Sequence, residues 1–279
     1  MRLLALSPGS LQQQLERLPA IATAAEQLKA TVQVACPMAH RQAWELLPAV
    51  EKVIPFNFDE GSTLADWANL LGCVREPDFQ VCFNFASGRQ VNLMLGMSHI
   101  PTRIALDGFS TTEQVQQGSG WKAQQLSGFL QAIGLHLDAE RFRLSLPAQT
   151  LDTVRAEQPG GDGPLLLMAP GGQANDWPES HWRTLPDTIR QRIPSLRSQQ
   201  LASGGKLQTR AAQVACSDVV LSSCPVTQLL AVFAGVPLVA LGADGADLPQ
   251  REGLRCLGDR GMDLSQLTEQ QVLSALGFG

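Results

Sequence analysis

The chain has 279 residues, and 44% of them are hydrophobic, which is enough to bury a large core in one domain or in two. Its net charge of −5 and its isoelectric point near 5.4 argue against a nucleic-acid-binding surface, because such a surface needs a basic face. The six cysteines form no C-x-x-C pair and show no zinc-finger spacing with the four histidines, which argues against a zinc module.

The N-terminal apolar run ends at Ser7-Pro8-Gly9, which is too early for a signal peptide. Nowhere do about 18 apolar residues follow one another, so no transmembrane helix is expected. Scattered cysteines are typical of proteins of a reducing compartment. The sequence therefore predicts a cytoplasmic protein, and it leaves peripheral contact with a membrane surface open.

Short aliphatic runs alternate with longer amphipathic stretches in the first half of the chain, which is the pattern of βαβ units and a parallel sheet. The predicted strands are Leu3 to Leu6, Val32 to Ala35, Lys52 to Pro55, Phe79 to Phe85 and Thr102 to Leu106. The predicted helices are Leu11 to Leu28, His40 to Leu47, Thr63 to Leu71, Ser87 to Met97 and Lys122 to Gly134. These elements make up a complete doubly wound domain.

A second series of the same kind follows a stretch rich in proline and glycine. Its predicted strands are Leu165 to Met168, Leu196 to Leu201, Val219 to Ser222 and Leu238 to Leu241. Its predicted helices are Glu179 to Arg192, Leu207 to Ala215, Thr227 to Ala234 and Ser265 to Leu276. Prolines and glycines between residues 147 and 163 interrupt regular structure, so we expect one domain over 1–150 and another over 151–279. The predicted class is α/β, with two Rossmann-like domains that face each other across a cleft.

Ligands of such sheets bind where the strands end, so the turns after the strands are the candidate sites. No turn has the G-x-G-x-x-G pattern and no Walker sequence occurs, which argues against a dinucleotide or P-loop site. The backbone amides of Gly171 and Gly172, in "APGGQANDWPESHW", could still meet a diphosphate. On spacing alone, a tight turn followed by a helix start is the favoured explanation of the same residues.

Several segments together resemble the family 9 glycosyltransferases, which include the ADP-heptose:lipopolysaccharide heptosyltransferases. In the first half they are "LALSPGSLQQQLERLPAI", "VEKVIPF", "PDFQVCFNFASGRQV" and "IPTRIAL". In the second half they are "LLMAPGGQANDWPESHWRTL" and "ACSDVVLSSCPVTQLLAVFAGVPLVALGAD". The resemblance implies the GT-B arrangement of two Rossmann-like domains. It also implies an envelope acceptor on the N-terminal half and an ADP-sugar on the C-terminal half. Because no cluster of carboxylates in the sequence suggests a bound cation, neither a metal nor another cofactor is expected.

The same resemblance places the family's acceptor-side turn at Gly9 and Ser10 and its catalytic aspartate at Gln13. In the family that aspartate is taken to remove the proton from the acceptor hydroxyl. A glutamine amide cannot accept this proton, so Gln13 is expected at most to orient the acceptor by hydrogen bonds.

On the donor side, the resemblance assigns six residues to nucleotide-sugar binding: Gly171, Gly172, Asn175, Ser223, Cys224 and Thr227. The family's cation before Trp-Pro falls on Asn175, and Asp176 beside it carries the opposite charge. The family's Asp-Thr-Gly segment falls on Cys224, Pro225 and Val226, where the proline removes a backbone N–H. After the strand that ends at Leu201 the chain runs directly into "SGGKLQTRAAQ", so a β-α segment is missing and the C-terminal domain is expected to be trimmed.

Other charged residues are candidates for chemistry, and each has a simpler explanation. Arg89 and Arg103 could meet an anionic acceptor, but surface ion pairs explain them as well. Lys206 and Arg210 form an i, i+4 cationic pair that could touch a diphosphate but is typical of a solvated helix face. His181 fits capping or packing as well as it fits catalysis.

Two hypotheses follow from the sequence. The first is a glycosyltransferase similar to the heptosyltransferases, which uses a nucleotide sugar and an envelope glycolipid acceptor. The second is a catalytically inactive relative that acts as a binding or assembly factor with a protein partner. The match of the scaffold favours the first, whereas the combined replacement of base, cation and glycine turn favours the second.

Overall fold

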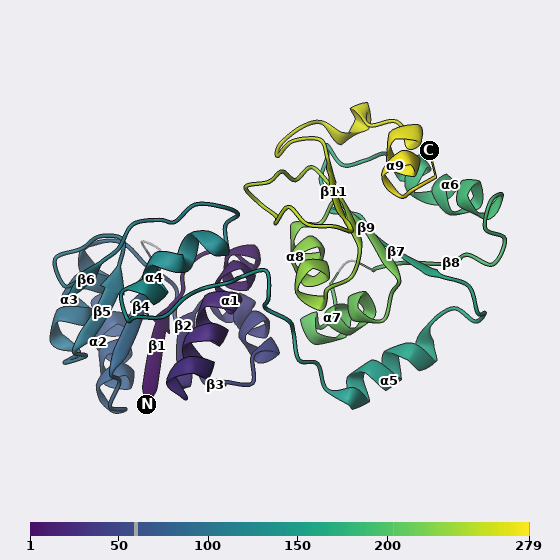
Figure 1. Ribbon diagram of the computed structural model, residues 1–279. Coiled ribbons are helices and arrows are strands. Elements are labelled where there is room, and N and C mark those ends of the chain that lie inside the picture. The colour runs from purple at the N-terminus through teal and green to yellow at the C-terminus, as the bar shows by residue number, and fades with distance from the viewer. Residues whose placement is uncertain (59–60, 203, 279) are drawn as a thin grey trace. The chain divides into compact units, whose positions relative to one another are not determined.

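The computed structural model describes residues 1–58, 61–202 and 204–278, and the chain divides into two compact units, Met1–Phe142 and Arg143–Gly279. Each unit contains one sheet of parallel strands with helices between them, which confirms the predicted α/β class (Figure 1). The division falls before residue 150, since the chain after Phe142 already bonds to the second unit. The N–H of Leu144 donates to the carbonyl of Phe233 at 3.0 Å.

The first unit carries a six-stranded sheet in the order β3-β2-β1-β4-β5-β6. Its strands are β1 (Arg2–Leu6), β2 (Thr31–Cys36), β3 (Val50–Pro55), β4 (Val81–Asn84), β5 (Thr102–Ala105) and β6 (Glu113–Gln114). Its helices are α1 (Leu11–Leu28), η1 (Met38–Leu46), α2 (Leu64–Arg75), α3 (Arg89–Met97), η2 (Gln124–Leu126) and α4 (Ser127–Gln131). The strand order reverses between β1 and β4, so the turns after these two strands flank the point where doubly wound sheets bind ligands.

The second unit carries a five-stranded sheet in the order β11-β10-β9-β7-β8. Its strands are β7 (Leu165–Ala169), β8 (Arg197–Gln200), β9 (Val219–Ser222), β10 (Leu238–Leu241) and β11 (Leu254–Leu257). Its helices are α5 (Ala148–Glu157), α6 (Glu179–Arg190), α7 (Leu207–Ala215), α8 (Pro225–Ala234), η3 (Leu264–Gln266) and α9 (Glu269–Ala275). The strand order reverses between β7 and β9. Within the described residues β8 leads directly to α7 and has no strand beyond it, as the missing β-α segment predicts.

The sequence missed three elements, and each lacks the signal on which such predictions depend. Helix α5 lies in the stretch where prolines and glycines predicted irregular structure, but Pro147 precedes its first residue and the glycines follow its end. Strands β6 and β11 carry no run of apolar residues. The helix expected over Ser265 to Leu276 is divided, because Thr268 caps a new helix, α9.

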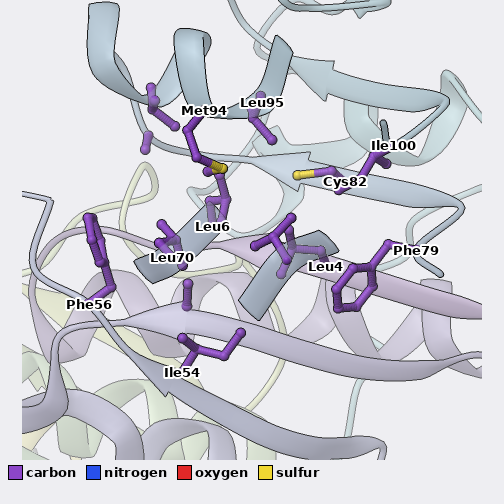
Figure 2. Close-up of a cluster of buried hydrophobic side chains, with 14 residues drawn as sticks. Leu4, Leu6, Ile54, Phe56, Leu70, Phe79, Cys82, Met94, Leu95 and Ile100 are labelled. Atoms are coloured by element: carbon purple, nitrogen blue, oxygen red, sulfur yellow. The ribbon is translucent and has the colours of Figure 1, made fainter. Parts of the chain in front are cut away.

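Helices α2 and α3 cover one face of the first sheet. A cluster of buried apolar side chains lies between these helices and the strands. Figure 2 shows Met94 and Leu95 on the helix side of this cluster, facing Leu6 and Cys82 on the strand side. All four side chains are at most 2% exposed. This apolar layer stabilises the end of β4 beside the end of β1, where Leu6 and Asn84 lie opposite each other in the register.

The turn between β1 and α1 is held closed by the buried side chain of Gln14. Its Oε1 accepts hydrogen bonds from Ser7 Oγ at 2.6 Å and from Trp44 Nε1 at 2.9 Å. Its Nε2 lies within hydrogen-bonding distance of the carbonyls of Ser7, Pro8 and Gly9, at 2.9 to 3.2 Å. One amide group thus satisfies most of the polar atoms of the turn, which no apolar side chain could do.

We expect Gln14→Leu to destabilise the protein by about 3 kcal/mol, because it leaves the buried Trp44 N–H and the turn carbonyls without their partner. Urea unfolding measures this change. The matched control is Gln12→Ala, which removes one partly buried hydrogen bond to Glu16 and should change the stability by about 0.5 kcal/mol or less. Equal effects of the two substitutions would contradict this role of Gln14.

Candidate functional site

The turn after β1 contains the residues predicted on the acceptor side, and its hydrogen bonds close on themselves. Gln13 and Ser10 form a capping box, in which Ser10 N–H donates to Gln13 Oε1 at 2.9 Å and Gln13 N–H donates to Ser10 Oγ at 3.4 Å. Gly9 has a φ of +91°, and a Cβ there would lie 2.0 Å from Gln13 Oε1. The Gln13 side chain is exposed, and its Nε2 makes no hydrogen bond within the described part of the chain.

A cation that is not among the predicted site residues lies against this turn. The guanidinium of Arg17 donates to Ser7 Oγ at 2.7 Å and to the carbonyl of Pro8, and its Cζ lies 4.9 Å from the centre of the Phe85 ring. Burial lowers the pKa of Arg17 from its ordinary value to about 10, and the neighbouring Glu16 opposes the shift. Arg17 therefore stays charged at neutral pH. It lies between the turn after β1 and Phe85, which follows β4.

The turn after β4 has hydrogen-bond donors that have no partner among the described residues. Asn84 is 2% exposed, and its Oδ1 accepts from the N–H of Ala86, while its Nδ2 has no partner among the described residues. Helix α3 begins after Gly88 with no side-chain cap. Its first residue, Arg89, is exposed. Uncapped N–H groups and a nearby cation attract anions, so this turn is the more open of the two in the first unit.

The turn after β7 contains the two glycines predicted to bind the donor, and its amides already have partners. Gly171 N–H donates to Ser223 Oγ at 2.8 Å, and a Cβ on Gly171 would lie 2.9 Å from the Ser223 carbonyl oxygen. The carboxylate of Asp176 accepts from Gly172 N–H at 2.8 Å and from Trp177 N–H at 2.7 Å. The Ser223 hydroxyl and the Asp176 carboxylate thus occupy the amides that a phosphate would need.

Asn175 does not join this group. Its Nδ2 donates to the carbonyl of Met262 at 3.2 Å, and its own carbonyl accepts from the N–H of Leu264. Trp177 beside it is buried and donates through Nε1 to the carbonyl of Leu267. The segment before α6 is therefore fixed to the loop that leads to α9, which assigns Asn175 a structural role.

The turn after β9 brings together the remaining predicted donor residues. Ser222 Oγ donates to the carbonyl of Ala169 or to that of Cys224, at 3.0 and 3.2 Å, and accepts from Cys224 N–H at 3.0 Å. Ser223 N–H also donates to the Ala169 carbonyl, so the turns after β7 and β9 are joined. Thr227, in the first turn of α8, is fully buried, and its Oγ1 has no partner among the described residues. Arg210 reaches this turn from α7, with Nη1 at 3.9 Å from Cys224 Sγ.

The other candidates have structural partners. Arg103 donates through Nε to the carbonyl of Ser110 at 2.6 Å, which holds the loop after β5. His181 stacks on Trp177, and its Nδ1 lies 3.6 Å from Glu269 Oε2. Within residues 1–58, 61–202 and 204–278, no three His, Cys, Asp or Glu side chains are grouped as around a metal ion. Over the same ranges no helix combines the length and apolar character that crossing a membrane requires.

No model of a known protein family matches the chain, and no curated protein sequence does. Solved structures do. The glycosyl transferase family 9 protein of Veillonella parvula DSM 2008 has a TM-score of 0.76 and 12% identity, over 99% of this chain and 96% of its own.

Two Escherichia coli proteins are similar to the chain in the same way. ADP-heptose lps heptosyltransferase II has a TM-score of 0.73 and 16% identity, over 99% of this chain and 98% of its own. The heptosyltransferase WaaC, in a structure with ADP-2-deoxy-2-fluoro heptose, has a TM-score of 0.71 and 15% identity, over 99% of each chain. The chain therefore has the fold of the family 9 glycosyltransferases that its sequence resembles, a GT-B type of fold.

Proposed function

We propose that the chain is a glycosyltransferase of the heptosyltransferase type, which transfers a sugar from a nucleotide sugar such as ADP-heptose to an acceptor of the cell envelope. The observation that carries this proposal is the similarity to a family 9 glycosyl transferase and to two heptosyltransferases, over at least 96% of each of them. In this proposal the first unit takes the acceptor and the second unit takes the donor. Protein groups, rather than a metal ion, compensate the charge of the diphosphate.

The transfer needs a hydroxyl oxygen of the acceptor to attack the anomeric carbon as the bond from that carbon to the diphosphate oxygen breaks. The diphosphate leaves with the electron pair, and the hydroxyl proton must go to a base. Gln13 cannot take that proton, so its role in this proposal is to donate its open Nε2 to the acceptor. Without a positioned base the reaction is expected to be slower by about 10²-fold or more.

A second candidate function is a binding or assembly factor that does no chemistry. Two observations favour it: Gln13 Oε1 serves the capping box, and Asp176 occupies the Gly172 amide. Both observations concern the chemical step or the turn after β7, and neither removes the donors of the turn after β9. The two candidate functions therefore share the same fold and differ in whether the protein transfers a sugar.

Calorimetric titration with ADP, followed by an assay for ADP released from ADP-heptose with an envelope acceptor, separates the two candidates. We expect ADP to bind in the titration. In the assay we expect ADP to be released slowly from ADP-heptose when the acceptor is present. Binding without release would support the assembly factor. The absence of heat at millimolar ADP would contradict the glycosyltransferase proposal.

Gln13→Asp tests the chemical step, and an aspartate can form the same type of capping box at this helix position. Asp66 has the corresponding position in α2, where it forms a capping box with Thr63. We expect transfer to accelerate about tenfold or more, because a carboxylate can accept the acceptor proton. Gln12→Asp, one residue away, is the control and should give no gain. No acceleration in Gln13→Asp would favour the inactive relative.

Asp176→Asn tests whether the internal carboxylate competes with the donor. Removing its charge from the amides of Gly172 and Trp177 should strengthen ADP binding about tenfold, as expected for one like charge at short range near a protein surface. Calorimetry measures the affinity. The control is Glu179→Gln, which removes an exposed carboxylate that pairs with Arg183. Unchanged or weaker binding in Asp176→Asn would show that the carboxylate does not oppose the ligand.

A further inference from the structure

The first turn of α8 keeps backbone donors that no other part of the described chain uses. The Cys224 side chain does not cap the helix, and Pro225 at its first position has no N–H. The N–H groups of Val226 and Thr227 make no hydrogen bond with the described residues. Open N–H groups at the positive end of a helix dipole favour an anion.

A buried hydroxyl without a partner lies in the same turn. Thr227 is fully buried, and its Oγ1 bonds to none of the described residues. A threonine in a helix commonly donates to a carbonyl three or four residues earlier, and Thr227 does not. The Cα–Cβ bond of a helical residue tilts toward the helix N-terminus, so the Cβ of Thr227 lies on the side of the first turn of α8. A buried polar group left unpaired is destabilising, and a bound ligand would account for it.

Arg210 places a cation at this end of the helix. Its Nη1 lies 3.9 Å from Cys224 Sγ, and its Nη2 donates to the carbonyls of Ala202 and Gly204 at 3.0 and 3.3 Å. The guanidinium is half-buried and forms no ion pair with a described carboxylate, whereas Lys206, its i, i+4 neighbour, is exposed. Arg210 is thus fixed at the start of α8 by packing and by two carbonyls, so the interpretation as a solvated helix face does not hold for it.

We propose that Arg210 binds the diphosphate of a nucleotide at the first turn of α8, which the resemblance already assigns to the donor, and that Arg210 supplies the positive charge missing at Asn175. The proposal rests on the proposed function and names the residue that compensates the donor's charge. It places the diphosphate at the turn after β9 rather than at the turn after β7, where Ser223 and Asp176 occupy the glycine amides. An arginine held by only part of its N–H groups can still bind phosphate oxygens with the others.

The test compares the binding of ADP, AMP and adenosine to the full chain by calorimetry. We expect Arg210→Gln to weaken ADP binding about tenfold or more, to weaken AMP binding less, and to leave adenosine binding unchanged. Arg210→Lys should recover part of the affinity. The matched control is Arg183→Gln, which removes an exposed arginine of the same unit that pairs with Glu179 and should leave ADP binding unchanged.

Thr227→Val is a second variant that keeps the shape of the side chain. Because it removes a buried hydroxyl that has no partner, it should fold at least as stably as the wild type and still bind ADP several-fold more weakly. Pyrophosphate should displace ADP from the wild type, and it should bind more weakly than ADP if the site serves a nucleotide rather than free phosphate.

The outcomes separate this inference from the proposed function. If the wild type binds ADP and both Arg210→Gln and Thr227→Val bind it equally well, the inference is wrong and the proposed function stands. Failure of pyrophosphate to displace ADP, or an equal loss of adenosine and ADP affinity in Arg210→Gln, would also overturn the inference. If the wild type does not bind ADP at millimolar concentration, the proposed function fails and the inference fails with it.

Discussion

What each unit can offer a ligand depends on which backbone N–H groups stay unpaired in the turns after its strands. A backbone N–H that is already well paired within the protein offers little to a ligand. In the turn after β1, Gln13 and Gln14 take up the polar groups. In the turn after β7, Ser223 and Asp176 take up the two glycine amides. The turns after β4 and β9 lie across the reversal of strand order, and each leads into a helix without a side-chain cap.

This distribution explains how a glutamine run can follow the first strand of a fold that resembles glycosyltransferases. Gln12 bonds to Glu16, Gln13 completes the cap of α1, and Gln14 holds the turn and Trp44 together. Each glutamine has its own structural partner, and none of the three can act as a base. In the proposed function, donor binding and transfer of the acceptor proton therefore depend on different turns.

Much of the fold could be predicted from the sequence. The alternation of aliphatic and amphipathic stretches predicted α1 over the range that the structure has, and it predicted β9 and β10 in the same way. The rule that ligand-binding turns follow the strands also singled out the turns of Gly171 and Ser223, which the structure joins by a hydrogen bond. The exposed edge strand β11 and the two-residue strand β6 carry no such pattern, because a strand without a buried face has no apolar period.

The site was less predictable, because its contacts join residues far apart in the chain. The role of Asp176 depends on the path of a loop, and the contact of Arg210 with Cys224 depends on how α7 lies beside α8. Arg17 could have been found, since it lies three residues after Gln14 and both side chains reach back to the turn from one face of α1. Nothing in the sequence signals that Thr227 is buried without a partner.

Amide hydrogen exchange in the presence and absence of saturating ADP tests the central claim most directly, because it reports on each turn separately. If the donors after β9 are open and those after β7 are occupied, ADP should slow exchange in peptides that contain Val226 and Thr227. Exchange around Gly171 and Gly172 should stay unchanged. The account would be contradicted if ADP slowed exchange at the two glycines and left exchange at the start of α8 unchanged.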